Sequence, residues 1–197
     1  MISLRISILP LLNQRMEYEH YKRLLAEPTF RKQFEDKSTD EFDCGKFVWT
    51  GKEEGASVLL QRVALGLEAR IPTAVSLELS CQGRLTRGIA NKLRDPFTLG
   101  NGGTADCYYN RAPALIEHKF ALCEANPRLW QLVQTFYRDI RNKLFHGGYV
   151  TDLTADKLDY IFSVFDEVYA WCGSWCDVTS RINEVGSGKH GRPTTKG

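Results

Sequence analysis

Residues 127–148 of the chain read PRLWQLVQTFYRDIRNKLFHGG, and this stretch carries the clearest helical pattern in the sequence. Its apolar residues recur at spacings of three and four, which puts them on one face of a helix. Pro127 stands where a helix start tolerates proline, and Gly147 and Gly148 suit the left-handed turn that closes a helix. We therefore expect an amphipathic helix over 128–145. Its stripe consists of Leu129, Leu132, Val133, Phe136, Tyr137, Ile140 and Leu144.

Three other segments predict core helices. One runs from Ala56 to a break at Pro72, and a second covers 73–94, with Thr73 as its cap. The third begins near Thr154, with Asp156 favourably placed in its first turn. A Gly-rich connection over 95–114 is expected to be a long loop. Four amphipathic helices of this kind pack naturally as a bundle, so the predicted fold class is all-α.

The ends of the chain are expected to lie outside this bundle. Residues 1–55 predict an N-terminal extension, with a helix over 16–26 and a short strand or loop at DCGKFVWTG. The bundle itself is assigned to 56–180. Residues 181–197 are polar and basic and predict a disordered tail.

Composition describes an ordinary globular protein with no global charge signal. The chain has 197 residues, with 43% hydrophobic and 25% charged residues and a formal net charge of +2. Any contact with RNA or DNA therefore has to come from a local patch. No segment approaches the length of a membrane span, and Pro10 interrupts the short apolar run at the N-terminus. The six scattered cysteines lack metal-ligand spacing, so we expect reduced thiols in a cytoplasmic protein with no metal and no cofactor.

The end of the 128–145 helix brings together an arginine, an amide and a histidine: Arg141, Asn142 and His146. On an ideal helix five residues turn about 500°, so Arg141 and His146 diverge by about 140°. They can converge if the helix distorts near Phe145, or across a dimer in which two copies of this corner face each other. An alternative is purely structural, because the helix macrodipole favours cations at a C-terminus and His146 would then be a cap.

These residue types suit metal-independent cleavage of RNA. A histidine that titrates near neutrality can take a proton from a ribose 2′-hydroxyl or give one to the leaving oxygen. Arg141 can hold the scissile phosphate and stabilise its developing charge. Asn142 can position the phosphate, a water or the histidine. Arg138 and Lys143 add positive charge for the RNA backbone.

The stretch YRDIRNKLFHGGYV, residues 137–150, resembles the signature of HEPN domains, named for higher eukaryotes and prokaryotes nucleotide-binding. In those all-α bundles an R-x(4–6)-H motif lies near the end of the third core helix, and its arginine is followed by a polar residue. Arg141, Asn142 and His146 match these three positions. The resemblance extends over about 56–176. Some HEPN proteins also carry an acidic residue facing the motif arginine, and Glu78 is our candidate for it. The alternative is that Glu78 is a solvated glutamate.

The resemblance implies a homodimer whose two motifs form one composite endoribonuclease site that needs no metal. It also implies a toxin or an anti-phage defence effector, and toxins of this family often pair with a nucleotidyltransferase-type antitoxin. Two alternatives stay open. One is a catalytically inactive HEPN-like module that binds nucleotide, RNA or a protein partner. The other is an unrelated helical protein in which Arg141 and His146 only close a helix.

Several other residues invite a functional interpretation that we set against a structural one. Tyr108 and Tyr109 can stack on bases, but packing of the loop explains them as well. Trp171 and Trp175 are expected in the core or in a dimer interface. The thiols that follow them, Cys172 and Cys176, share a helical spacing of four that is no redox motif.

Overall fold

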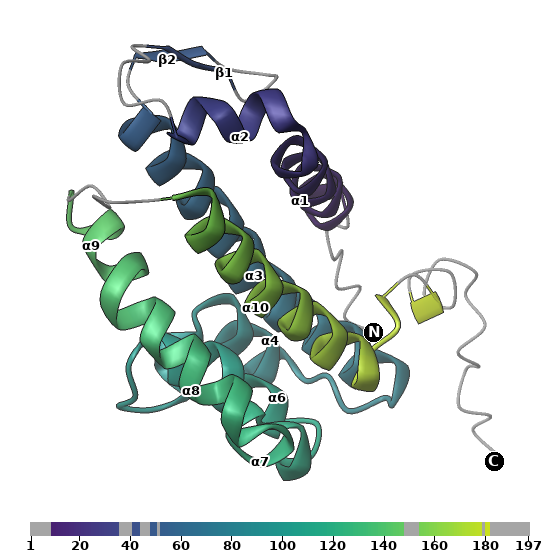
Figure 1. The fold of residues 1–197 in the computed structure, drawn as a ribbon. Coiled ribbons are helices and arrows are strands. Elements are labelled where there is room, and N and C mark those ends of the chain that lie inside the picture. Colours follow the sequence, from purple (N-terminus) through teal and green to yellow (C-terminus); the bar gives the residue numbers. More distant parts are fainter. Residues whose placement is uncertain are drawn as a thin grey trace, which may run out of the picture. The chain divides into compact units, whose positions relative to one another are not determined.

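Helices make up nearly all of the structure, a computed structural model that describes residues 9–35, 41–43, 48–50, 52–147, 154–178, 180 and 181 (Figure 1). The predicted all-α class is confirmed for these residues, apart from a short antiparallel hairpin of β1 (Glu41–Asp43) and β2 (Val48–Thr50). The longer helices are α1 (Leu9–Ala26), α2 (Pro28–Glu35), α3 (Lys52–Cys81), α4 (Arg87–Arg94), α8 (Pro127–Phe136) and α10 (Ala155–Trp175). The shorter turns are η1 (Pro96–Leu99), α5 (Thr104–Asp106), η2 (Cys107–Arg111), α6 (Ala112–Ala114), η3 (His118–Phe120), α7 (Leu122–Ala125), η4 (Tyr137–Arg141) and α9 (Asn142–Phe145).

Pro72 lies inside α3 and does not end it, so the predicted break at this position is wrong. Proline removes one hydrogen bond from a helix, but the surrounding side chains are deeply buried, and burial of Ile71 and Val75 offsets that loss. Thr73 does not cap a new helix. Its hydroxyl instead donates to the carbonyl of Ala69, 2.8 Å away, one turn earlier in the same helix.

The predicted helix over 73–94 is divided into the end of α3 and the separate helix α4. Gly83 adopts φ of +67°, and the backbone N–H of Arg84 donates to the Leu79 carbonyl at 2.8 Å, which closes α3. Thr86 then caps α4, because its hydroxyl accepts from the N–H of Ile89 at 3.2 Å. A glycine turn and a threonine cap therefore end one helix and begin the next.

The chain forms two compact units, and the described part of each comes from two separate segments. The described part of unit 1 consists of residues 69–128 and 168–181, and that of unit 2 lies within 9–68 and 129–167. The helices α1 and α2 fall in the predicted extension 1–55, and they belong to unit 2 together with the helix that carries Arg141. The predicted tail lies outside the described residues except for Arg181.

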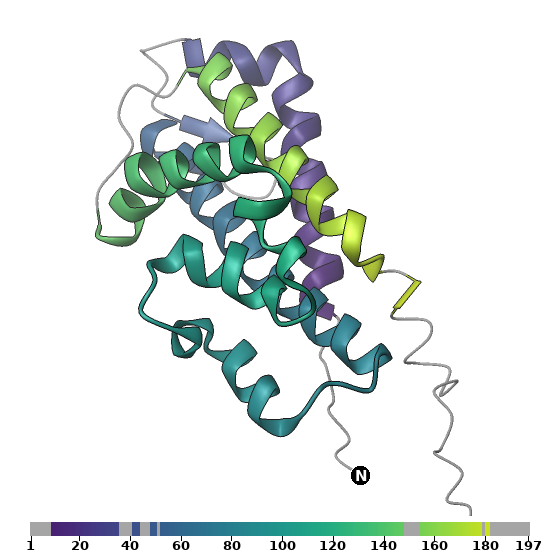
Figure 2. The same cartoon turned by 90° about the horizontal axis from the view of Figure 1, so that it is seen from below.

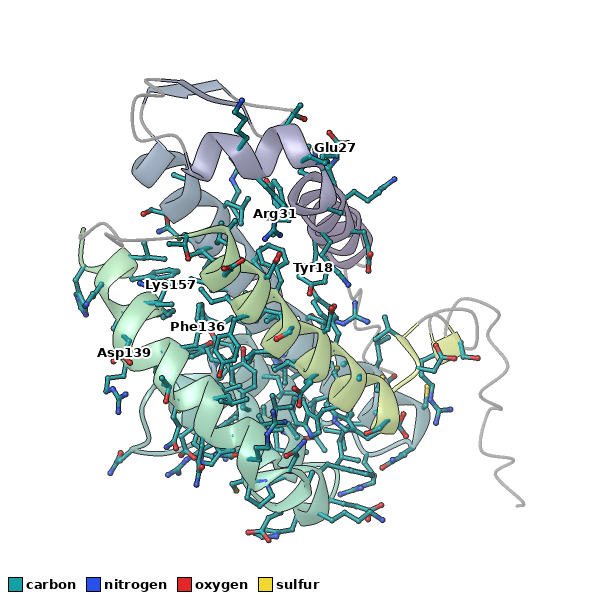
Figure 3. All side chains as sticks on the ribbon, in the orientation of Figure 1. Tyr18, Glu27, Arg31, Phe136, Asp139 and Lys157 are labelled. Atoms are coloured by element: carbon teal, nitrogen blue, oxygen red, sulfur yellow. The ribbon has the colours of Figure 1, made fainter. Side chains whose placement is uncertain are left out.

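In unit 2, α1 and α2 are fastened to α10 (Figure 3). The Tyr18 hydroxyl donates to the Phe162 carbonyl at 3.1 Å and to Asp166 at 2.7 Å, and the Tyr18 ring stacks on the Phe162 ring. Lys22 pairs with the same Asp166 at 2.8 Å. Arg31 pairs with two carboxylates at the start of α10. These contacts make the N-terminal helices part of the packing of unit 2.

The predicted stripe of the motif helix faces the core of unit 2. Phe136 packs edge to face against Phe165 of α10, with ring centroids 4.9 Å apart. The last helix also begins as predicted, since the Thr154 hydroxyl accepts from the N–H of Lys157 at 3.2 Å. The buried members of the stripe are Leu129, Val133, Phe136, Tyr137 and Leu144, and the half-buried ones are Leu132 and Ile140.

In unit 1 the predicted loop over 95–114 is largely a series of short helical turns (Figure 2). Tyr109 is 2% exposed and stacks on Trp171, so packing explains this tyrosine. Trp171 and Trp175 are both buried, which confirms their place in the core. Asn110 joins two turns, because its amide donates to Asp106 and accepts from the N–H of Cys123, both at 2.9 Å.

The two thiols at the end of α10, Cys172 and Cys176, lie in surroundings that make them unreactive. Burial raises the pKa of the Cys172 thiol to about 11 and that of the Cys176 thiol to about 12. At neutral pH both remain protonated, and a protonated buried thiol is a poor nucleophile. This environment agrees with the interpretation of the pair as core residues.

Candidate functional site

The helix that carries the motif runs from Pro127 to Phe145 through three consecutive elements, α8, η4 and α9. The element η4 is a wider, π-helical turn, and Arg141 is its last residue. Such turns insert one residue into a helix and are often found at functional sites. The predicted helix over 128–145 is therefore confirmed, with a local distortion before the motif and not at Phe145.

The glycine stop also appears where the sequence predicts it. His146 is the C-cap, with φ of −98° and ψ of 18°, and Gly147 follows with φ of +79°. The N–H of His146 still donates to the carbonyl of Asn142 at 3.1 Å. Asn142 and His146 are therefore four residues apart on one remaining helical turn, a spacing that places side chains next to each other.

Arg141 is held in a buried ion pair with Glu68 of α3. Its Nε donates to Oε1 at 2.9 Å and its Nη2 to Oε2 at 3.1 Å, while the side chains are only 13% and 6% exposed. The guanidinium carbon lies 3.8 Å from the centre of the Phe145 ring and 5.6 Å from that of Tyr137. The Tyr137 hydroxyl also donates to Glu68 Oε1 at 2.8 Å. Two hydrogen bonds and two aromatic rings thus fix the orientation of the arginine, and a third hydrogen bond fixes the carboxylate that it binds.

The ion pair leaves one end of the guanidinium unoccupied. Glu68 binds Nε and Nη2 of Arg141. Within the part of the chain that the structure describes, the remaining nitrogen, Nη1, has no hydrogen-bond partner. A guanidinium carries five N–H donors, so a bidentate contact with one carboxylate leaves donors for a second oxyanion. Arg141 can therefore keep Glu68 and still contact a phosphate.

Glu78 does not hold Arg141, and this prediction is wrong. The Glu78 carboxylate accepts from Arg181 at 2.9 and 3.2 Å and from the Gln82 amide at 2.9 Å. It is 6% exposed, so it is not solvated either. The acidic residue that faces the motif arginine is Glu68.

The sequence itself carries a signal for Glu68. Glu68 directly follows Leu67 and borders the apolar stripe of α3, where a carboxylate is costly unless a cation neutralises it. Such a position calls for an arginine or lysine partner. Periodicity along one helix cannot say which cation this is, because Arg141 lies 73 residues away.

The remaining motif residues lie on the exposed side of the same helix. Asn142, Lys143 and His146 are exposed, and in the described region neither the Asn142 amide nor the His146 ring has a hydrogen-bond partner. Arg138 is exposed and pairs with Asp139 at 2.7 Å, and this hydrogen bond lowers the pKa of the Asp139 carboxyl. Exposed polar groups thus surround a motif arginine whose position is fixed.

Arg141 and His146 do not meet within one chain in the region described. Arg141 bonds to Glu68 and covers Phe145, whereas His146 is exposed at the cap. In that region no hydrogen bond or ring contact joins the two side chains. A site that uses both side chains on one phosphate needs either a rearrangement or a second copy of the chain.

A groove of about 370 Å³ lies beside the motif in unit 2, between the motif helix and α10. We call it the α8–α10 groove. Its lining includes Phe136 and Asp139 from the motif helix and Lys157 from α10, which are labelled in Figure 3. Its apolar lining includes the half-buried Leu132 and Ile140 and the exposed Tyr160. Lys143 and Lys157 give its rim positive charge, and Asp139 gives it negative charge.

Two further properties concern the chain as far as it is described. Among the described residues, no group of three or more histidine, cysteine and carboxylate side chains could ligate a metal ion. None of the helices found there combines the length and the apolar character needed to cross a bilayer. Comparisons with models of known protein families, with curated proteins and with solved structures give no match.

Proposed function

We propose that the protein is a HEPN-type endoribonuclease that cleaves RNA without a metal, through Arg141, Asn142 and His146. The observation that carries the proposal is the state of Arg141, which Glu68 and two rings hold in place while Nη1 has no partner among the described residues. A fixed cation with a spare donor is suited to a phosphate, because it needs no reorganisation when charge develops. Asn142 and His146 supply uncommitted polar groups one turn away.

In the proposed reaction His146 acts as the proton-transfer group. As a base it takes the proton of a ribose 2′-hydroxyl, and the resulting oxygen attacks the adjacent phosphorus. The bond from phosphorus to the 5′-oxygen breaks, and that oxygen takes a proton from the protonated ring of His146. The products are a 2′,3′-cyclic phosphate and a 5′-hydroxyl. Arg141 stabilises the charge on the non-bridging oxygens, and Arg138 and Lys143 contact the flanking backbone.

The proposal includes a homodimer, because Arg141 and His146 of one chain do not meet. We assign the α8–α10 groove to the second copy. Its apolar lining is only partly buried, with Tyr160 57% exposed, and its rim carries both Asp139 and Lys157. A two-fold axis can place Asp139 of one copy opposite Lys157 of the other copy, and the reverse. The groove adjoins the motif, so such a dimer brings the two motifs near each other.

The biological role that accompanies this activity is that of a cytoplasmic toxin or anti-phage defence effector. A nucleotidyltransferase-type antitoxin is the partner we propose for a toxin. This part of the proposal rests on the resemblance of 137–150 to the HEPN signature. Co-purification of an RNase-inactive variant with the product of an adjacent nucleotidyltransferase gene is the corresponding test.

One observation favours a second candidate, a catalytically inactive module that binds nucleotide, RNA or a protein. The charge of Arg141 is already neutralised by Glu68, and its side chain is mostly buried. A buried ion pair of this kind also serves simply to fix one helix on another. Turnover separates the two candidates, since only the enzyme produces new RNA ends.

The experiment is cleavage of a labelled RNA by wild type and by His146→Ala, with the ends analysed for 2′,3′-cyclic phosphate. We expect His146→Ala to abolish cleavage, and a chelator to leave the wild-type rate unchanged. His118→Ala is the matched control, because His118 is an exposed histidine outside the motif. Equal cleavage by wild type and His146→Ala refutes the mechanism, and so does an activity that the chelator removes.

A further inference from the structure

In the described part of the chain, the cations of residues 84–94, within and just before α4, lack the carboxylate partners that several other cations have. Lys22, Arg111 and Arg181 each form an ion pair with an aspartate or a glutamate. Residues 84–94 contain four cations and no acidic residue. These cations are Arg84, Arg87, Lys92 and Arg94, and none forms an ion pair with a described residue.

The charge of this segment is large for the molecule. Residues 82–101 hold the four cations and one acid, Asp95, so their net charge is 4 − 1 = +3, whereas the whole chain has a net charge of +2. Arg84 donates to the carbonyls of Leu115 and Ile116, at 3.1 and 3.0 Å, which fixes its position without neutralising it. This segment therefore carries a local positive charge larger than the formal net charge of the chain.

The fold of α4 directs these cations to solvent. Ala90 and Leu93 are buried at 8% and 4% exposure, while Arg87, Lys92 and Arg94 are exposed. Seven residues turn an ideal helix by about 700°, so Arg87 and Arg94 lie within about 20° of each other and about 10 Å apart along the axis. The two arginines thus form a row on one face.

An exposed aromatic side chain follows this row. Phe97, in η1, is 51% exposed, and Tyr108 supports it in an edge-to-face contact with ring centroids 6.2 Å apart. In Figure 2 the teal part of unit 1 contains α4 and the irregular segment after it. An exposed, supported ring next to unpaired cations is the combination that binds single-stranded nucleic acid, by stacking a base and by contacting phosphates.

We infer that Arg84, Arg87, Lys92, Arg94 and Phe97 form a binding surface for single-stranded RNA, the α4–η1 surface. The unpaired cations contact phosphates, and Phe97 stacks on an unpaired base. A duplex offers no unpaired base to Phe97, which favours a single strand. A membrane surface fits less well, because Ala90 and Leu93 of α4 are buried, Ile89 is half-buried, and Phe97 is the exposed large apolar side chain of this segment. The inference deepens the proposed function, since it rests on RNA as the substrate, but binding tests it without cleavage.

The test measures binding to a fluorescein-labelled 20-nucleotide oligouridylate by fluorescence anisotropy. The full chain carries His146→Ala, so that the RNA stays intact. The test variant adds Arg87→Ser and Arg94→Ser. The control variant adds Arg23→Ser and Lys32→Ser instead, which remove two exposed cations from α1 and α2 of unit 2. Circular dichroism compares the helix content of the two variants.

We expect the dissociation constant of the test variant to rise at least tenfold and that of the control variant to change less than twofold. The slope of log K against log salt concentration falls by about 1.4, because each phosphate contact with a single strand contributes about 0.7. Phe97→Ser weakens binding about tenfold with little change in this slope, since stacking is not ionic.

Several outcomes overturn the inference. One is equal binding by the test and control variants, and another is no measurable binding of the oligouridylate. A third is that the test variant loses binding to vesicles with 20% phosphatidylserine while its oligouridylate binding is unchanged. This result would assign the α4–η1 surface to membranes. RNA binding that depends on α4, without cleavage by wild type, supports this inference and refutes the proposed function. Cleavage by wild type together with equal RNA binding by the test and control variants supports the proposed function and refutes this inference.

Discussion

Two glutamates on α3 each bind one arginine, and the two pairs are nearly equal in local geometry. Glu68 accepts from Arg141 at 2.9 and 3.1 Å, and Glu78 accepts from Arg181 at 2.9 and 3.2 Å. They differ in their surroundings. Arg141 is 13% exposed and lies against two rings, whereas Arg181 is 33% exposed.

The comparison teaches that a carboxylate beside an arginine does not by itself indicate function. In unit 1 the pair fixes the segment after α10, and in unit 2 it fixes the residue to which we assign phosphate binding. Exposed, uncommitted groups next to Arg141, namely Asn142 and His146, make the difference. The two pairs therefore serve as each other's control in the experiments that follow.

The largest expected effect comes from truncating the two glutamates. Glu68→Ala leaves the buried Arg141 without its counter-charge, which costs about 3–5 kcal/mol of unfolding free energy. Glu78→Ala costs about 1–2 kcal/mol, because the more exposed Arg181 can return to water. Urea denaturation measures both. Equal losses would show that the burial of the arginine does not set the energy of the pair.

Removing both partners of the buried pair is expected to cost less than removing one. The double change Glu68→Leu with Arg141→Leu leaves no buried charge, so it should be more stable than Glu68→Ala by about 1–3 kcal/mol. The same denaturation experiment checks this. If the double variant loses as much unfolding free energy as the two single variants together, the two side chains are not energetically coupled.

A smaller effect is expected from the groups that support each glutamate. Tyr137→Phe removes one buried hydrogen bond to Glu68 and should cost about 1 kcal/mol. Gln82→Met removes the corresponding bond to Glu78 from an exposed side chain, and it should cost under about 0.5 kcal/mol. Thermal unfolding followed by circular dichroism resolves the difference. The reverse order would contradict the assignment of Glu68 as the more tightly held carboxylate.

Local sequence patterns predicted the motif helix well, and the reason is physical. The stripe from Leu129 to Leu144, the proline at its start and the stop at Gly147 all act within a few residues of each other. The start of α10 at the Thr154 cap is predictable on the same ground. Helix periodicity and capping need no knowledge of the rest of the chain.

Long-range contacts were not predictable in this way. Pro72 normally ends a helix, but the burial of Ile71 and Val75 is a tertiary effect that overrides the local rule. The resemblance points to Glu78 because of its place on the second predicted helix, and only the fold brings Arg141 to Glu68 and Arg181 to Glu78. The π-helical turn before Arg141 likewise has no local sequence signal.

The central claim is that Arg141 contacts the scissile phosphate whereas Arg181 only supports the fold. The most direct test is the single-turnover rate of RNA cleavage by Arg141→Lys and by Arg181→Lys in the presence of a chelator. Each lysine keeps one charge beside its glutamate but loses the planar fork that binds two oxyanions. We predict a loss of about 100-fold or more for Arg141→Lys and a change of less than about twofold for Arg181→Lys. Equal rates for the two folded variants would contradict the account.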